Sequence, residues 1–193
     1  MSKIKVMLKG FLSVMCGNKE QIKMMIPNYY AKSVYSIDYQ ELYQRGIVNL
    51  IFDIDNTILP VNDIKVDEKL VKLFIDLIAD GFNICIVSNN SVERVNPVAE
   101  KLKVISLSNA DKPKKEAFDK ALKLLESDIS STAMIGDQML TDIKGANEYG
   151  LCSILVDPLL NKYDFKTGTS RILQNIMELK LKRENKFIKH KYY

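Results

Sequence analysis

Short apolar runs alternate with amphipathic segments through the middle of the chain. The apolar runs have the length of buried β-strands, and they are IVNLIFDI (47–54), NICIVSN (83–89), KVISLS (103–108), STAMIGD (131–137) and LCSILV (151–156). The segments between them are long enough to be crossover helices. Continuous apolar strands that alternate with helices predict an α/β fold, in which helices cover both faces of a parallel sheet.

The segment from Asp67 to Asp80 has a clear helical pattern. Its apolar residues recur every three or four positions and form one face: Leu70, Leu73, Phe74, Leu77 and Ile78. Gly81 follows at the position where a left-handed residue commonly ends a helix. We therefore expect one crossover helix here.

The first part of the chain, residues 1–25, forms a basic amphipathic segment. Helical spacing places its apolar residues on one side and Lys5 and Lys9 on another, and these apolar residues are Ile4, Leu8, Phe11 and Met15. Such a helix is suited to lie on a membrane surface. The alternatives are a helix docked on the core and a frayed end.

The last part of the chain, residues 166–193, begins with another helical stripe, formed by Ile172, Ile176 and Leu179. It then becomes almost wholly basic. We interpret it as a helix that caps the core, followed by a disordered basic tail. The expected division is therefore an N-terminal segment (1–25), one α/β domain (26–165) and a C-terminal helix with its tail (166–193).

Basic residues gather at both ends of the chain, although the formal net charge is only +4. They are Lys3, Lys5, Lys9, Lys180, Lys182, Arg183, Lys186, Lys189 and Lys191. Basic ends favour an anionic membrane surface or nucleic acid as a partner, and solvated tails are the alternative. Nucleic acid is less favoured because few aromatic residues are interleaved with the basic ones before Tyr192.

Length and cysteine content narrow the class of protein. The 193 residues are enough for one α/β domain and few for two. No stretch reaches the roughly 18 uncharged apolar residues that indicate a membrane span. Cys16, Cys85 and Cys152 cannot all pair within the chain, which favours a reducing cytoplasm.

The N-terminus faintly resembles a secretory signal, but Lys9 interrupts its apolar run. We therefore expect the N-terminal segment to be retained.

Two carboxylates and a hydroxyl follow the first predicted strand, as Asp53, Asp55 and Thr57. In a parallel α/β sheet, ligands bind beyond the carboxyl ends of the strands. Two close carboxylates repel each other and are best tolerated around a cation, and Mg2+ prefers a few carboxylates together with water and phosphate oxygens. The pair therefore predicts a metal. His190 is the only histidine, so chemistry that depends on histidine has little support.

Other polar residues follow the later strands. Ser88 and Asn89 end the second strand, where a hydroxyl and backbone N–H groups can hold phosphoryl oxygens. Lys112 precedes a proline at the start of a predicted helix and can neutralise a phosphate. The fourth strand ends in GDQMLTD, which contributes Asp137 and Asp142. Capping and turn aspartates are the plainer interpretation of each motif alone, but the ordered set favours a site.

The segments FDIDNT, IVSNN, DKP and GDQMLTD resemble the four motifs of the haloacid dehalogenase (HAD) superfamily of phosphatases over about residues 47–156. The residues within these motifs are similar to those of the YqeG-type branch of subfamily IIIA, whose relatives include phosphatidylglycerophosphate phosphatases. The segment IPNYYAKSVYSIDYQELYQRGI extends this resemblance back to about Ile26. No motif residue departs from the family pattern.

The resemblance implies that Asp53 is the nucleophile and a ligand of Mg2+. It implies that Asp55 protonates the leaving alcohol and later deprotonates the attacking water, while its backbone carbonyl binds the metal. Asp137 would be the third protein ligand. A covalent intermediate divides the displacement into two steps, and one acid can donate and later accept the proton.

The resemblance also assigns the residues that bind the phosphoryl group. Thr57, Ser88 and Lys112 would hold its oxygens, with Asn89 beside them. Asp142 would orient Lys112 or a metal-bound water.

A Rossmann-like strand order, 5-4-1-2-3, is the further implication, with the first and fourth strands adjacent at the point where the order reverses. No cap domain fits into residues 58–67 or 89–111. An open site excludes water poorly by itself. A large phosphate monoester that covers the site is therefore favoured, and a lipid phosphate such as phosphatidylglycerophosphate meets this need at an anionic membrane surface.

Several alternatives remain open at this point. Capless relatives also act on soluble, protein or nucleic-acid phosphates. A non-catalytic phosphate-binding protein and a phospho-acceptor signalling domain are two other classes, which the pair Asp53 and Asp55 disfavours. The sequence favours a cytoplasmic protein, peripheral to the membrane if the lipid interpretation is correct, and indicates no particular oligomeric state.

Overall fold

The computed structural model describes residues 12, 15–16, 18–61, 63–159, 168–183 and 186–187. Most of the expected N-terminal amphipathic helix, with Ile4, Leu8 and Phe11, lies outside these residues. Lys189 and Lys191 of the basic tail lie outside them too. The expected division of the chain into three parts stays a prediction.

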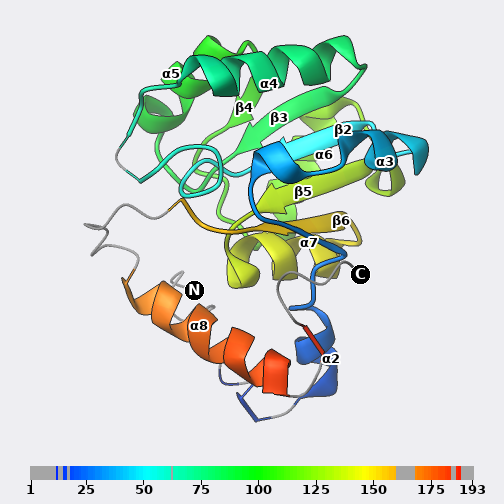
Figure 1. Ribbon diagram of the computed structural model, residues 1–193, viewed down its shortest axis with the longest axis vertical. Helices are drawn as coiled ribbons and strands as arrows, with labels where there is room; N and C mark the ends of the chain where they lie inside the picture. Colours follow the sequence, from blue (N-terminus) through cyan, green and yellow to red (C-terminus); the bar gives the residue numbers. More distant parts are fainter. Residues whose placement is uncertain are drawn as a thin grey trace.

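A six-stranded parallel sheet forms the centre of the fold, in the order β1-β6-β5-β2-β3-β4 (Figure 1). Its strands are β1 (Tyr29–Ala31), β2 (Asn49–Phe52), β3 (Asn83–Val87), β4 (Ile105–Leu107), β5 (Thr132–Gly136) and β6 (Cys152–Val156). The strands β6-β5-β2-β3-β4 have the order 5-4-1-2-3 that the motifs implied. The α/β class is thereby confirmed.

The edge strand β1 was not predicted, and the expected sheet was one strand too narrow. This strand is short, and its YYA sequence lacks the apolar run that marked the others. Its pairing with β6 is supported by side chains. Asn28 Oδ1 accepts from the backbone N of Ser153 at 2.8 Å, and the backbone N of Asn28 donates to Ser153 Oγ at 3.1 Å. Because these polar contacts join residues that are distant in sequence, the local order of apolar and polar residues did not reveal the strand.

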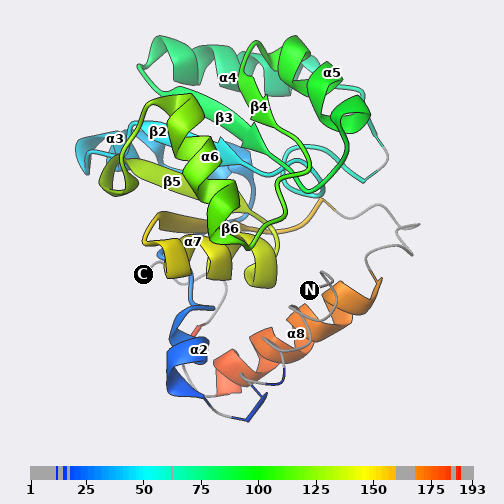
Figure 2. The ribbon, with the colours of Figure 1, turned by 180° about the vertical axis from the view of Figure 1, so that it is seen from behind.

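Helices cover both faces of the sheet (Figures 1 and 2), as expected. Their bounds are α2 (Lys19–Lys23), α3 (Tyr39–Gln44), α4 (Glu68–Ala79), α5 (Val92–Leu102), α6 (Lys115–Leu125), α7 (Lys144–Tyr149) and α8 (Gly168–Arg183). Three short helical turns are η1 (Val34–Ser36), η2 (Ile129–Ser131) and the π-helical η3 (Met139–Ile143).

Alternate residues of the central strand β2 face opposite sides. Phe52 packs with α3, α4 and α5, and its ring centroid lies 5.1 Å from that of Phe74 in α4. Ile51 points to the other face, where it joins Phe118 of α6 and Ala146 of α7. A strand that is buried on both faces is largely apolar, which is why the pattern of this strand was so clear.

A third apolar cluster lies beyond α7, at the β1 edge of the sheet. Met177 and Leu181 of α8 pack there with Ile22, Met25 and aromatic and aliphatic side chains of the edge strands. Segments from the two ends of the chain therefore share one core, and Figures 1 and 2 place α2 beside the C-terminal end of α8.

Helix α8 packs on the domain, but not through the stripe that the sequence suggested. Its inward side carries Met177 and Leu181, which are fully buried. Ile172, Ile176 and Leu179 are 60%, 37% and 57% exposed. The stripe was the stronger local signal, but the surface offered by the sheet edge decides which face of the helix is buried.

No cap domain covers the carboxyl edge of the strands in the described residues. Residues 53–67 connect β2 to α4, and only α5, β4 and their short connections lie between β3 and α6. The expectation of a capless fold is confirmed. Among the same residues, we find no helix that is both long and apolar enough to cross a membrane.

The orientation of α8 is testable by unfolding. We expect Met177→Ala to lower the free energy of unfolding by about 2–5 kcal/mol, because a fully buried side chain leaves a cavity. Ile176→Ala, at the neighbouring exposed position, should cost less than about 1 kcal/mol. Urea denaturation of both variants measures the difference. Equal losses would show that α8 packs through its other face.

Candidate active site

The candidate site is built where the strand order reverses. Strand β2 pairs with both β3 and β5, and Phe52 lies beside Ile135 in the register. Asp53 follows β2 and its backbone N donates to the carbonyl of Ile135 at 3.0 Å. Asp137 follows β5 at the same edge. The parallel register therefore places two carboxylates from distant parts of the sequence next to each other.

Three buried carboxylates gather at this edge. Asp53, Asp137 and Asp142 each offer an oxygen, and these oxygens lie within 4.8 Å of one another. The expected metal ligands were Asp53, Asp137 and Asp55, the last through its backbone carbonyl. The structure brings the first two together and adds the carboxylate of Asp142, whereas the carboxylate of Asp55 points elsewhere.

Lys112 lies between two of these acids. Its Nζ is 2.8 Å from Asp53 Oδ1 and 2.8 Å from Asp142 Oδ1, and all three side chains are buried. The group therefore contains three carboxylates and one ammonium. Buried charge of one sign is costly, so a divalent cation fits the group.

The pKa values follow from the same arrangement. Burial raises the pKa of Asp53 to about 6; Lys112 opposes this shift, while Asp142 adds to it. Burial acts to lower the pKa of Lys112, but the charges of Asp142 and Asp53 outweigh it, so the pKa is raised. Lys112 is therefore held as a cation, and Asp53 is mostly a carboxylate at neutral pH, the form needed by a nucleophile.

Asn89 fixes the backbone of Lys112. Its Oδ1 accepts from the backbone N of Lys112 at 2.6 Å, and its Nδ2 donates to the carbonyl of Lys112 at 3.0 Å. The side chain thus joins the loop after β3 to the loop after β4. Contact between Asn89 and substrate stays a prediction.

Two hydroxyls lie in the same region. Thr57 is buried, and its Oγ1 donates to Asp137 Oδ1 at 3.3 Å. Ser88 is also buried, and its Oγ accepts from the backbone N of Asn90 at 3.2 Å. Thr57 lies on the turn that carries Asp53 and Asp55, and Ser88 directly follows the neighbouring strand β3. Their contacts with a phosphoryl group stay predictions.

Gly136 makes room for Asp142. A Cβ atom at this glycine would lie 2.4 Å from Asp142 Oδ2, which is far inside contact distance. The same oxygen accepts from the backbone N of Gln138 at 3.1 Å, so the first turn of η3 holds the carboxylate against the strand end. The pairing of glycine with the two acids in GDQMLTD thus has a steric reason.

Asp55 is held by residues that the sequence did not single out. Arg94 of α5 donates from Nη2 to Asp55 Oδ1 at 2.8 Å, and Asn90 donates from Nδ2 to Asp55 Oδ2. Arg94 also donates to the carbonyl of Pro60 at 3.1 Å. A single arginine among many basic residues carries no local signal, so only the packing of α5 against this turn reveals it.

Gln174 of α8 also reaches the site. Its Nε2 donates to the carbonyl of Asp137 at 3.0 Å, and its Oε1 accepts from the backbone N of Met139 at 3.4 Å. The side chain is buried. Sequence reasoning missed this residue because it lies on a helix distant in sequence and belongs to no motif.

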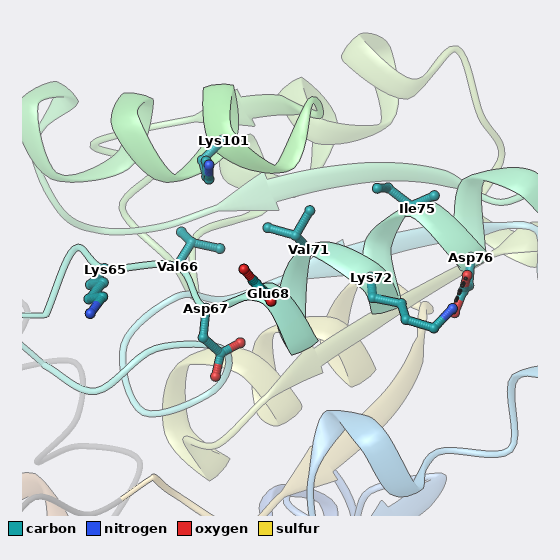
Figure 3. Close-up of a pocket in the computed structure, with 9 residues that line it drawn as sticks. All are labelled: Lys65, Val66, Asp67, Glu68, Val71, Lys72, Ile75, Asp76 and Lys101. Carbon is teal, nitrogen blue, oxygen red and sulfur yellow. Dashed lines mark hydrogen bonds and ion pairs between the residues drawn. The ribbon is translucent and has the colours of Figure 1, made fainter.

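A hollow of about 800 Å³ lies elsewhere, between the start of α4 and Lys101 of α5 (Figure 3). Its lining mixes Lys65, Lys72 and Lys101 with acidic and aliphatic side chains. None of the lining residues carries the acids or hydroxyls described above. This hollow is thus separate from the carboxyl edge of the strands where the acids gather.

Two family models match the chain in consecutive segments. The model described as a haloacid dehalogenase-like hydrolase matches residues 50–110, and the one described as HAD-hydrolase-like matches residues 109–158. Together they span all the strand ends that carry the candidate residues.

Individual relatives agree with these matches. The probable phosphatase YqeG of Bacillus subtilis (strain 168) is 31% identical over 162 residues, which are 84% of this chain and 94% of that protein. The chloroplastic phosphatidylglycerophosphate phosphatase 1 of Chlamydomonas reinhardtii is 24% identical over 158 residues, which are 77% of this chain and 58% of that protein. A solved structure of 3-deoxy-D-manno-octulosonate 8-phosphate phosphatase from Moraxella catarrhalis is 22% identical, covering 77% of this chain and 94% of that chain at a TM-score of 0.46.

The chain therefore belongs to the haloacid dehalogenase family and is a phosphatase, a hydrolase of phosphoric monoesters. Within that family, it is similar to the YqeG-type branch that the motif wording indicated. The acids of the cluster, Asp53, Asp137 and Asp142, stand in segments that the family models match.

The role of Gly136 is testable by a double-mutant cycle. We expect Gly136→Ala to lower turnover of p-nitrophenyl phosphate at least about tenfold, because the new Cβ must displace Asp142 from Lys112. In the background of Asp142→Gly the same substitution should cost little, because every atom that the new Cβ would meet belongs to the removed side chain. Steady-state rates of the two single variants and the double variant measure this coupling. Additive losses would mean that Gly136 acts independently of Asp142.

Proposed function

We propose that this phosphatase is magnesium-dependent, that it works through a phospho-aspartyl intermediate on Asp53, and that its substrate is a lipid phosphate such as phosphatidylglycerophosphate. The observation that carries the chemistry is the buried set of Asp53, Lys112, Asp142 and Asp137. It combines an ionised carboxylate, a fixed cation and an excess of negative charge in one place.

In the proposed first step, a carboxylate oxygen of Asp53 attacks phosphorus, and the bond from phosphorus to the alcohol oxygen breaks. Asp55 gives its proton to the leaving oxygen. In the second step, water attacks phosphorus while Asp55 accepts its proton, and the bond to Asp53 breaks to release inorganic phosphate. Asp55 lies two residues beyond the nucleophile and is only partly exposed, which supports a role in proton transfer.

The proposed Mg2+ ion would be held by the carboxylates of Asp53 and Asp137 and by the backbone carbonyl of Asp55. When bound, it neutralises the oxygens of the phosphoryl group and lowers the repulsion that an anionic nucleophile meets. Lys112, Thr57 and Ser88 would hold the same oxygens. In this scheme, Asp142 keeps Lys112 in place, which its distance of 2.8 Å from Nζ supports.

The proposal of a lipid substrate has two supports. The carboxyl edge of the strands has no cap in the described residues, so a bulky substrate or a surface must exclude water during the reaction. One relative is named a phosphatidylglycerophosphate phosphatase. We accordingly propose a cytoplasmic protein that is peripheral to the membrane. Soluble, protein and nucleic-acid phosphates, and binding without catalysis, are the alternatives that an assay must separate.

A substrate panel tests the proposal. We expect phosphate release from phosphatidylglycerophosphate in mixed micelles to exceed release from soluble phosphomonoesters, and EDTA to abolish it. Asp53→Asn should lower turnover at least about a thousandfold without loss of the fold, since it removes the charge of the nucleophile with little change of shape. Asp128→Asn, at an exposed position outside the site, is the matched control.

The panel separates the parts of the proposal. Preference for a soluble ester would retain the chemistry and discard the lipid. Normal turnover by Asp53→Asn would overturn the covalent mechanism, and no release from any ester would favour a binding protein.

The contact between Arg94 and Asp55 generates a prediction on leaving groups. Without Arg94 the Asp55 carboxylate loses the partner that orients it, so Arg94→Ala should slow hydrolysis of an alkyl phosphate about 10–100-fold. p-Nitrophenyl phosphate has a leaving group that needs little protonation, and its rate should fall much less. Lys101→Ala, on the same helix, is the control. Equal losses for both esters would assign Arg94 a role other than positioning the acid.

A further inference from the structure

Helix α8 carries apolar residues on two opposite faces. The inward face is covered by the third apolar cluster, through Met177 and Leu181. Ile172, Ile176 and Leu179 are spaced by four and three residues, which places them on one outward face, here named the α8 stripe. All three are exposed. Adjacent large aliphatic side chains on one helix face are uncommon on a protein surface that binds nothing.

The exposed charges at the C-terminal end of α8 have one sign. Lys182 and Arg183 end the helix and are exposed. Glu178 is the only acid of α8, and it lies toward the inward side, where its Oε1 accepts from Gln174 Nε2 at 3.0 Å. The stripe is therefore followed by cations and has no exposed acid on its own helix. This is the composition of a helix that lies in an anionic lipid interface.

The exposed apolar surface of α4 differs from that of α8 in the charges that surround it. Ile75 and Ile78 of α4 are also exposed, but Glu68 and Asp76 lie on the same helix. Figure 3 shows Asp76 paired with Lys72 beside Ile75. Mixed charge gives no attraction to an anionic surface, so α4 serves as the internal comparison for α8.

The neighbourhood of α8 extends the basic and apolar character. Met15 and Leu12 are exposed, and the Nζ of Lys180 donates to the carbonyl of Met15 at 2.8 Å. Helix α2, near the C-terminal end of α8 (Figures 1 and 2), exposes Lys19 and Lys23 and one acid, Glu20, so its net contribution is basic.

We propose that the α8 stripe and the basic end of α8 form the surface that docks on an anionic lipid bilayer, with the helix axis parallel to the interface. The aliphatic side chains would enter the boundary between head groups and acyl chains, and the cations would contact lipid phosphates. The proposal rests on the proposed function only in assigning a purpose to docking. Docking itself is measured as vesicle binding, independently of hydrolysis.

The position of α8 links docking to the site. Its first turn lies on the side of the molecule toward which β5 and β6 point, and this side carries the acids (Figure 1). From the inward face, Gln174 donates to the carbonyl of Asp137. One helix thus has its outer face toward the proposed lipid surface and its inner face bonded to the loop that carries a proposed metal ligand.

Vesicle flotation of the full chain tests the apolar contact. We expect binding to vesicles of phosphatidylglycerol and phosphatidylcholine, and little binding to phosphatidylcholine alone. The triple variant Ile172→Ser, Ile176→Ser, Leu179→Ser should bind the anionic vesicles at least about tenfold more weakly. The double variant Ile75→Ser, Ile78→Ser, which removes exposed apolar residues from α4, should bind within about twofold of the parent.

The charge contribution has its own matched pair of variants. Lys182→Glu, Arg183→Glu should weaken binding to the anionic vesicles and reduce its dependence on salt. Lys120→Glu, Lys123→Glu makes the same change of charge on α6 and should have a small effect. Equal weakening by both pairs would show that net charge alone attracts the protein, and it would overturn α8 as the docking surface.

Turnover of p-nitrophenyl phosphate, measured on every variant, separates docking from catalysis. The variants of α8 should keep this activity within about twofold. A parent protein that hydrolyses esters without binding anionic vesicles would overturn the docking proposal and leave the phosphatase chemistry intact. Vesicle binding without any hydrolysis would support the docking proposal and contradict the proposed chemistry.

Light scattering after size-exclusion chromatography tests the alternative that the α8 stripe binds a second copy of the chain. A parent dimer that the triple variant converts to a monomer, with no vesicle binding by the parent, would assign the α8 stripe to self-association and overturn the lipid proposal. A parent mass that the triple variant leaves unchanged, together with lost vesicle binding, would support it.

Discussion

A lysine ammonium buried between two carboxylates is the interaction on which the carboxyl edge of the sheet depends. Lys112 neutralises part of the charge that Asp53 and Asp142 bring into a nearly dry environment, where an unpaired charge would be destabilising by several kcal/mol. Each member is fixed separately, since β2 delivers Asp53, Asn89 holds the backbone of Lys112, and the space above Gly136 admits Asp142. The three acids gathered at this edge are a set of ligands that a divalent cation fits.

The sequence predicted those parts of the molecule in which one local signal decided the structure. Strands buried on both faces are largely apolar, so the central strands were predictable from their pattern, while their order was implied by the resemblance of the motifs to those of a known family. The acids Asp53 and Asp137 were identifiable because they interrupt or end such runs. Contacts between distant segments were not predictable. Arg94 meets Asp55 only after α5 packs, and Gln174 reaches Asp137 only after α8 docks, so neither leaves a periodic trace in the sequence.

Helix α8 shows the limit of pattern reading in another way. Its most regular apolar stripe, which begins at Ile172, faces outward, whereas Met177 and Leu181 face the core. Periodicity reveals that a helix has an apolar face but not which surface covers that face. Where a helix has two, the geometry of the surface on which it packs selects one, and the other is available for a partner.

The edge strand β1 has a consequence for how the chain becomes ordered during synthesis. It precedes β2 in the sequence, yet its pairing partner is β6, whose first paired residue is Ile154. The segment around Ile22 likewise shares its core with Met177. Residues made first by the ribosome therefore find their native neighbours only when almost the whole domain has emerged. Strand β2 also pairs with β5, which lies beyond β3 and β4 in the sequence, so the sheet as a whole depends on contacts that close long loops, and such contacts form slowly.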